Sequence, residues 1–203
     1  MTTPFADVTG ALLCAFHVAC IGDTRWAASA TPLHKDGAWH WIEANHRFNT
    51  LLWREEDLAR RMDVADAEIA ANKRAIDRYN QQRNDAVERI DEVLLARIEH
   101  VAPQPNAWHN AETAGAMIDR LSILALKTFH MAQAASRSDA TDTQRTSWHA
   151  RHAQLTLQRR DLAGCLDTLL SQTAAGRAYW RIYRQFKMYN DAALNPYLRE
   201  RAR

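Results

Sequence analysis

The segment from residue 66 to residue 100 contains neither glycine nor proline, and its apolar side chains recur every three or four residues. This spacing places the apolar side chains on one face of an α-helix. Asp66 is a favourable N-cap for the helix, and Pro103 and Pro105 stop it. A helix of this length would extend for roughly 50 Å. The segment is therefore predicted to be the spine of a helical domain.

The rest of the chain also favours helices, because only 6 Gly and 5 Pro occur in 203 residues. Strand-like alternation is nearly absent, and the strong helix formers Ala, Leu, Arg, Glu and Gln dominate. Further helices are predicted at about 7–20, 39–61, 113–135, 148–173 and 176–189, with a polar loop at 136–147 and an extended or flexible tail at 190–203. The predicted fold class is all-α: an antiparallel helix bundle that forms a single domain over residues 1–203.

Composition and charge exclude several classes of protein. Hydrophobic residues make up 47% of the chain, enough for a sizeable core, and the net charge is only +2 with both signs interspersed, which argues against nucleic acid as a partner. No stretch reaches the roughly 20 apolar residues of a membrane span. The apolar run at 8–21 follows only Asp7 and lacks the basic start of a signal peptide. We therefore expect a cytoplasmic protein without a transmembrane segment.

No metal or cofactor site is predicted. Cys14, Cys20 and Cys165 lack CxxC spacing, so they are expected to be reduced and buried rather than to form disulfides or bind zinc. Glu43 and His46 form a Glu-x-x-His pair, as in di-iron bundles, but that site needs a second such pair. Phosphate-binding loops and dinucleotide fingerprints are also missing.

On the predicted spine helix, polar side chains fall on the face that a bundle would bury. Arg83 lies in the middle of the apolar stripe, and Asn80 and Asn84 lie on its edge. A guanidinium group cannot lose its proton, so a buried arginine needs an anionic partner. That partner is either a carboxylate of the protein or a bound ligand.

Two other helices show the same conflict between polarity and predicted burial. The helix predicted at 39–61 has a polar stripe along its apolar side, made of Asn45, Asn49 and Glu56. The helix predicted at 113–135 is apolar nearly all round, which is typical of a buried helix. It nevertheless contains Asp119, Arg120 and Lys127, with the two cations two turns apart on one face.

Two interpretations of these polar residues stay open. The first is a closed network of ion pairs and amide hydrogen bonds, for example Arg83 with Glu56, and Arg120 with Asp119 or Asp77. The second is a polar pocket between helices, where bundles usually hold ligands. Burying many charges is costly unless they serve a purpose. Arginine and lysine beside asparagine indicate an anion such as a phosphate or a carboxylate.

Four runs of the sequence resemble one bacterial family: NHRFNTLLWREEDLARR (45–61), KRAIDRYNQQRNDAVERIDE (73–92), ETAGAMIDRLSILALKTFHM (112–131) and YRQFKMYNDAALNP (183–196). The family is domain of unknown function 4254, and IDRLSILALK is a fairly specific phrase of it. The family usually has proline where this chain has Ala114. The resemblance implies a helical protein, often encoded beside glycosyltransferases of lipopolysaccharide or other surface-glycan assembly. It implies a pathway and not a reaction.

The first functional hypothesis is a pocket that binds an anionic sugar or sugar phosphate of envelope glycan synthesis. The anion would be held by Arg83, Arg120 and Lys127. The sugar hydroxyls would be bound by Asn45, Asn49, Asn80 and Asn84. A general acid or base, if a reaction is catalysed, would be Glu56 or Asp119. Whether the protein is an enzyme is left open.

The second hypothesis is a non-catalytic accessory bundle that docks on a glycosyltransferase, with buried charges that are purely structural. Long helices and 7 tryptophans also favour a homodimer, because both make adhesive surfaces.

Overall fold

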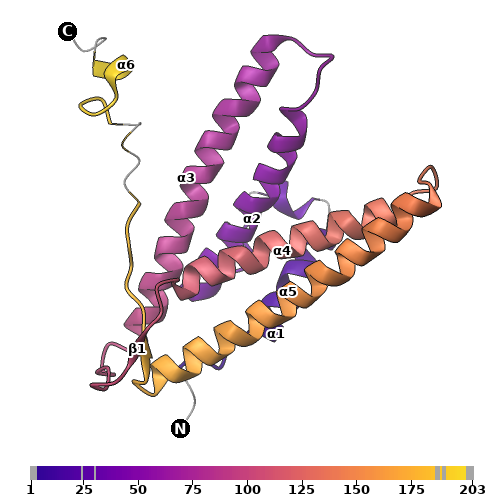
Figure 1. Cartoon of the computed structure of the whole chain (residues 1–203). Helices are drawn as coiled ribbons and strands as arrows, with labels where there is room; N and C mark the ends of the chain where they lie inside the picture. Colours follow the sequence, from indigo (N-terminus) through magenta and orange to yellow (C-terminus); the bar gives the residue numbers. More distant parts are fainter. Residues whose placement is uncertain (1–3, 24, 30, 186–187, 189–190, 200–203) are drawn as a thin grey trace.

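The computed structural model describes residues 4–23, 25–29, 31–185, 188 and 191–199. Over these residues the chain is predominantly helical, which confirms the predicted all-α class (Figure 1). In chain order the elements are α1 (Gly10–Gly22), the 3-10 helix η1 (Trp26–Ala28), α2 (Gly37–Leu58), α3 (Asp66–Ala96), β1 (Trp108–His109), α4 (Ala114–Ala135), α5 (Asp142–Ala174), β2 (Ala178–Tyr179) and α6 (Pro196–Arg199).

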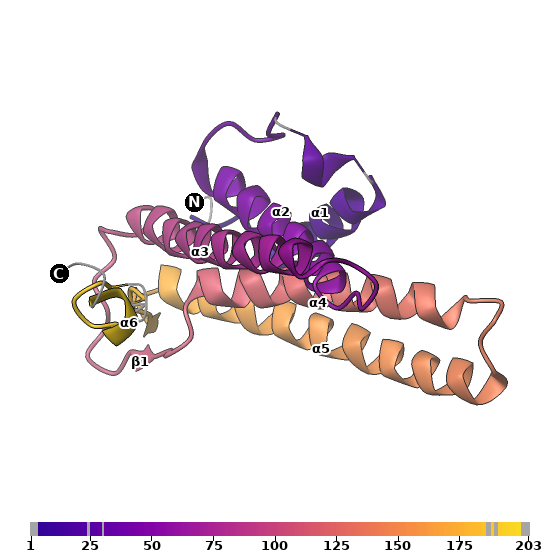
Figure 2. The same cartoon turned by 90° about the horizontal axis from the view of Figure 1, so that it is seen from above.

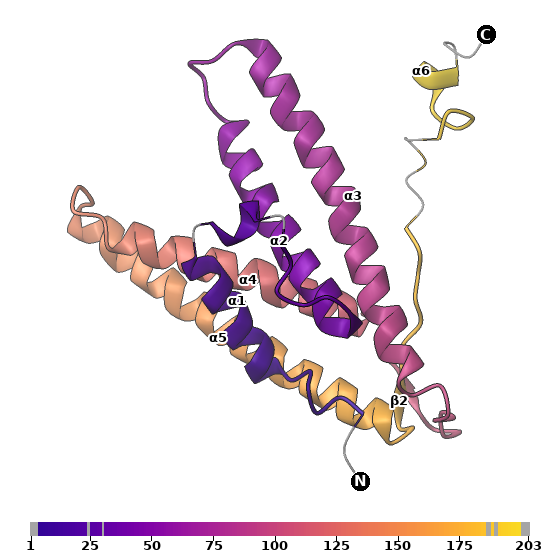
Figure 3. The ribbon, with the colours of Figure 1, turned by 180° about the vertical axis from the view of Figure 1, so that it is seen from behind.

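The long helices are arranged as hairpins that cross each other. α2 and α3 form one antiparallel hairpin, and α4 and α5 form another; α3 and α4 diverge from a common end near β1 (Figure 1). Seen from above, α2 and α3 lie over the α4–α5 hairpin (Figure 2). α1 packs across α4 and α5 (Figure 3). α3 has 31 residues, in keeping with the predicted spine, and α5 has 33.

The hydrophobic core lies where the hairpins and α1 meet. Its largest aliphatic side chains are almost fully enclosed: Leu13, Ile42, Ile90, Leu94, Ile118, Leu121, Leu166 and Leu169. Within a helix these residues are three or four positions apart, so they share one face. Burying each side chain stabilises the fold by about 1.5–3 kcal/mol. The core therefore joins the helices at their crossing, while the half of α5 nearer its start is exposed on most sides.

Two helices begin in direct contact with another helix. The N–H of Gly115, in the first turn of α4, donates to Asp91 Oδ1 of α3 at 2.8 Å, and the N–H of Gly10 in α1 donates to Asp167 Oδ1 of α5 at 2.7 Å. A β-carbon at Gly115 would lie only 2.5 Å from the backbone oxygen of Val87. Glycine thus permits the close approach, and the carboxylates bind N–H groups that a helix leaves unpaired.

The predicted helix at 176–189 does not form over its described residues. Gly176 adopts a φ of +70°, which ends α5. The N–H of Arg177 then donates to the oxygen of Gln172 at 2.9 Å and closes the helix end. The chain continues as β2, which pairs in parallel with β1. α6 lies inside the predicted tail, while residues 186–187, 189–190 and 200–203 lie outside the described residues.

Other helix limits move by a few residues. α5 begins at Asp142, inside the predicted loop, because Thr141 and Gln144 form a capping box. The Thr141 hydroxyl accepts from the N–H of Gln144, and the Gln144 side chain accepts from the N–H of Thr141. α3 begins at Asp66, with Ala65 rather than the predicted Asp66 at the N-cap, and it ends at Ala96, four residues before the predicted limit. The polar composition of residues 136–147 favoured a loop, so the helix start after Thr141 was not predicted.

The cysteines are free, as predicted, but they are not all buried. Cys20 is buried, and burial raises the pKa of its thiol to about 12. Cys14 is half-buried, and Cys165 is exposed because it lies on the outer face of α5. The described helices include none with the length and apolar character needed to cross a membrane.

Candidate functional site

The polar stripe of α2 faces α4. Asn45 and Asn49 are one turn apart, and both are buried. Asp119 of α4 accepts a hydrogen bond from the Nδ2 of each amide, at 2.8 Å in both cases. One carboxylate therefore holds both amide groups in place. Asp119 orients these neighbours, and its contacts join two of the helices that were expected to converge.

A serine and a histidine continue this network into the core. Asn49 Nδ2 also donates to Ser122 Oγ at 3.0 Å, and Ser122 Oγ lies 2.7 Å from His46 Nδ1. His46 Nε2 lies 3.2 Å from the carbonyl oxygen of His17, which can only accept, so Nε2 carries the proton and Ser122 donates to Nδ1. Burial lowers the pKa of His46 to about 3. The neutral pair resembles a nucleophile and its base, but both side chains are fully enclosed, so we assign it a structural role.

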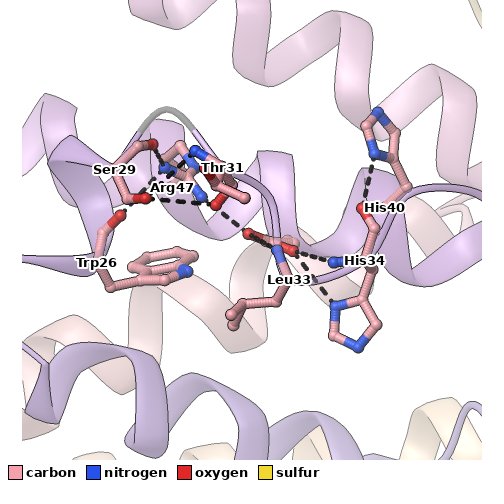
Figure 4. Close-up of polar contacts among 8 residues, drawn as sticks. Trp26, Ser29, Thr31, Leu33, His34, His40 and Arg47 are labelled. Carbon is pink, nitrogen blue, oxygen red and sulfur yellow. Dashed lines mark hydrogen bonds and ion pairs between the residues drawn. The ribbon is translucent and has the colours of Figure 1, made fainter.

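Glu43 holds the loop that precedes α2, where Leu33 and His34 are labelled in Figure 4. Its carboxylate accepts hydrogen bonds from the N–H groups of Leu33, at 3.0 Å, and His34, at 2.9 Å, and it pairs with Arg47 at 2.8 Å. Burial by itself would raise the pKa of Glu43. These hydrogen bonds outweigh burial, so the pKa lies below its ordinary value.

Arg47, the ion-pair partner of Glu43, also binds the backbone at η1. It donates to the carbonyl oxygen of Trp26 at 3.0 Å and to that of Ser29 (Figure 4). The Glu43 and His46 side chains, which could have been half of a metal site, are thus occupied by contacts within the protein. Among the described residues, no three His, Cys, Asp or Glu side chains are grouped closely enough to hold a metal ion.

A cleft of about 330 Å³ opens beside this network, between α2, α3 and α4. Its lining includes four of the predicted site residues: Asn49, Glu56, Asn80 and Arg83. Trp53 and the apolar side chain of Leu126 contribute to its walls. We call this cavity the Arg83 cleft.

Arg83 is the cation of this cleft that lacks a carboxylate partner. It is half-buried, and its guanidinium donates a hydrogen bond to Asn84 Oδ1 at 3.1 Å. Its Nε is buried without a hydrogen-bond partner, and within the described ranges no carboxylate oxygen lies within 4.0 Å of the guanidinium. The ion pair considered between Arg83 and Glu56 is absent, because Glu56 pairs with Arg60 at 2.8 Å.

Asn84 lies on the other side of Arg83 and lines a second cavity of about 480 Å³ between α3, α4 and residues 182–185. Its Nδ2 donates to Gln185 Oε1 at 2.8 Å. The Arg83–Asn84 hydrogen bond therefore connects the walls of two neighbouring cavities. We call the second one the Asp91 cavity.

Asp91 is the buried carboxylate of this cavity. It accepts the hydrogen bond from Gly115 that fixes the start of α4. Burial raises the pKa of Asp91 to about 6, although hydrogen bonds from Thr113 and Gly115 act in the opposite direction. Asp91 therefore has a structural role: its carboxylate binds an N–H group in the first turn of α4.

Arg120 and Lys127 do not join Arg83, which corrects the prediction for both. Arg120 is exposed and pairs with Glu112 at 2.8 Å, not with Asp119 or Asp77. Lys127 is exposed and lines a separate groove between α4 and α5. The two cations share a face of α4, and neighbouring helices cover the opposite face.

Several structural residues of the site were not predicted: Glu43, His46, Ser122 and Asp91. Asp91 had a usable signal, because it lies one turn after Val87 and three residues before Leu94 on the inner face of α3. His46 likewise lies between the buried Ile42 and the buried Asn49. The role of Glu43 is explained by its partners in the loop before α2 and by Arg47 one turn later, and the role of Ser122 by its partners on α2.

The family model described as "Protein of unknown function (DUF4254)" matches residues 39–182, which is most of the chain. No curated protein and no solved structure matches the chain. The matched region begins in α2, includes α3, α4 and α5, and contains the Arg83 cleft with all of the residues that line it. This chain therefore belongs to the DUF4254 family.

Proposed function

We propose that the protein binds a small anionic sugar, such as a sugar phosphate, in the Arg83 cleft. The observation that carries the proposal is the state of Arg83: a half-buried guanidinium in a cavity, with an unpartnered Nε and no carboxylate oxygen within 4.0 Å among the described residues. A buried arginine is costly unless an anion compensates it. A phosphate or carboxylate can accept two parallel hydrogen bonds from a guanidinium.

The remaining lining is suited to the rest of a sugar. The Asn80 amide offers a donor and an acceptor to hydroxyl groups, Asn49 offers its Oδ1 as an acceptor because its Nδ2 donates to Asp119 and Ser122, and the indole of Trp53 offers a flat apolar wall. Asp119 holds the Asn49 amide from behind, so that amide is positioned before a ligand arrives. Glu56 is half-exposed and could accept from a hydroxyl group.

The cleft accounts for a binding function without assigning a reaction. Of the carboxylates predicted as acid or base, Asp119 is committed to two amides and Glu56 to Arg60. The resemblance to a family found beside glycosyltransferases points to lipopolysaccharide or other envelope glycans as the source of the ligand. Docking on a glycosyltransferase is the alternative, in which the cleft would stay without a small ligand.

A thermal-shift screen tests the proposal. The wild type is melted with and without sugar phosphates, nucleotide sugars and the corresponding neutral sugars. Anionic sugars are expected to raise Tm, because a ligand that binds only the folded state stabilises it. Neutral sugars are expected to have a smaller effect. A screen in which no anionic sugar stabilises the wild type contradicts the proposal and favours the docking alternative.

Substitution of Arg83 then locates the site. Arg83→Gln is expected to weaken binding of an active sugar phosphate by about 10- to 150-fold, since a hydrogen bond to a charged group is worth about 1.5–3 kcal/mol. Arg74→Gln is the matched control, because Arg74 is exposed on the same helix and outside the cleft. Equal affinity in both variants would place the ligand elsewhere.

A further inference from the structure

A groove of about 560 Å³ runs along the seam between α4 and α5, where Trp53 of α2 reaches over it. On α5, Trp148, Arg151 and Leu155 are three and four residues apart, so they share one face. On α4, Lys127 and Met131 are one turn apart and face the same seam. The groove therefore combines apolar walls with two cationic side chains.

The cations of the groove are uncompensated within the part of the chain that the structure describes. Lys127 and Arg151 form no ion pair there, and no Asp or Glu side chain lines the groove. Arg120, on the same face of α4 as Lys127, is by contrast paired with Glu112. The groove consequently presents unbalanced positive charge beside apolar surface.

The wall formed by Trp53 is held in place by a neighbouring ring. The indole stacks on His130, with centroids 4.5 Å apart and an interplanar angle of 3°. Burial lowers the pKa of His130, so the ring is neutral near pH 7 and does not add to the positive charge. The groups available to bind a ligand are therefore the cations Lys127 and Arg151 and the apolar walls.

We propose that this groove binds a ligand in which a phosphate or carboxylate group is joined to an apolar body, either a hydrocarbon chain or an aromatic ring. Lys127 and Arg151 bind the anionic group, and Trp148, Met131 and Leu155 surround the apolar body. Charge complementarity selects an anion, and the apolar walls select against a bare inorganic ion. The groove shares Trp53 with the Arg83 cleft, but none of its cations, so the inference does not depend on the proposed function.

Isothermal titration calorimetry with octyl phosphate and phenyl phosphate tests this inference on the full chain. Each probe is compared with inorganic phosphate, and octyl phosphate also with octanol. At least one of the two organic phosphates is expected to bind on the order of 10-fold more tightly than inorganic phosphate or octanol, because both halves of the ligand contribute. Tighter binding of octyl phosphate identifies a chain, and tighter binding of phenyl phosphate identifies a ring.

The double variant Lys127→Gln/Arg151→Gln assigns the site. It is expected to weaken binding by about 10-fold or more, since two charge-assisted contacts are lost. The control Arg74→Gln/Arg160→Gln removes the same charge from exposed positions outside the groove, and it should bind like the wild type. Both pairs are exposed, so neither change should unfold the protein.

A second variant addresses the apolar half. Met131→Glu replaces an apolar wall of the groove with a carboxylate one turn from Lys127, so it should abolish binding of the organic phosphates. The inference is overturned if neither organic phosphate binds better than inorganic phosphate, or if the Lys127/Arg151 variant binds as tightly as the control. Arg83→Gln should leave this binding unchanged, which separates a failure of this inference from a failure of the sugar-binding proposal.

Discussion

Gly115→Ala is expected to destabilise the protein by about 2–5 kcal/mol, because the junction of α3 and α4 has no room for a side chain. The added β-carbon would lie 2.5 Å from the backbone oxygen of Val87 and 2.7 Å from Asp91 Oδ2, so α4 would have to shift. Overpacking of this kind costs about 1–3 kcal/mol. Stretching the hydrogen bond to the Asp91 carboxylate costs about 1.5–3 kcal/mol more. The higher helix propensity of alanine offsets at most about 1 kcal/mol.

Urea unfolding followed by circular dichroism measures this loss of unfolding free energy. In a thermal melt, Tm should fall by about 4–20 °C. Gly164→Ala is the matched control, because a β-carbon at that exposed position of α5 meets no atom within 4 Å. That substitution should raise stability by about 0.5–1 kcal/mol, as alanine replaces glycine inside a helix. Equal stability of the two variants would refute the argument that close contact at Gly115 fixes the start of α4.

Two further predictions concern buried ionisable groups. Glu43→Gln should cost about 3–5 kcal/mol in urea unfolding, because it breaks a buried pair, whereas the exposed Glu56→Gln should change stability by less than about 1 kcal/mol. The pKa values of His17 and His46 lie below the ordinary value of 6.5, so their stabilisation is complete above pH 6.5 and is lost as the pH falls below it. Asp91, with a pKa raised from 3.8 to about 6, acts in the opposite sense, losing stability as the pH rises through that interval. Two histidines outweigh one carboxylate, so unfolding at pH 5 should require less urea than at pH 7; equal midpoints would contradict this.

The inward direction of polar residues could be predicted for α2 and α3 but not for α4. Asn45, Asn49 and Arg83 were assigned to inner faces, and they lie beside the network or the cleft. Arg120 and Lys127 were misplaced because α4 has apolar residues around most of its circumference. Its own sequence therefore does not say which side the other helices cover.

The function of several polar groups depends on partners that are far away in the chain. Ser122 and His46 are separated by 76 positions, and Asp91 serves a helix that begins 23 positions later. Their hydrogen bonds exist only after the hairpins have crossed. Local spacing can place such a group on an inner face, but neither spacing nor residue type identifies its partner.

The amino-acid sequence by itself determined the helical class, the long helix that begins at Asp66 and the inner faces of α2 and α3, because helix periodicity is a property of neighbouring residues. Tertiary structure alone decided that the chain turns at Gly176 and continues as β2. It also decided that Arg83 lines a cleft and that Arg120 forms an ion pair with Glu112. These outcomes depend on how helices distant in the chain approach one another. That approach is set by the combined packing of the whole core, which no single segment encodes.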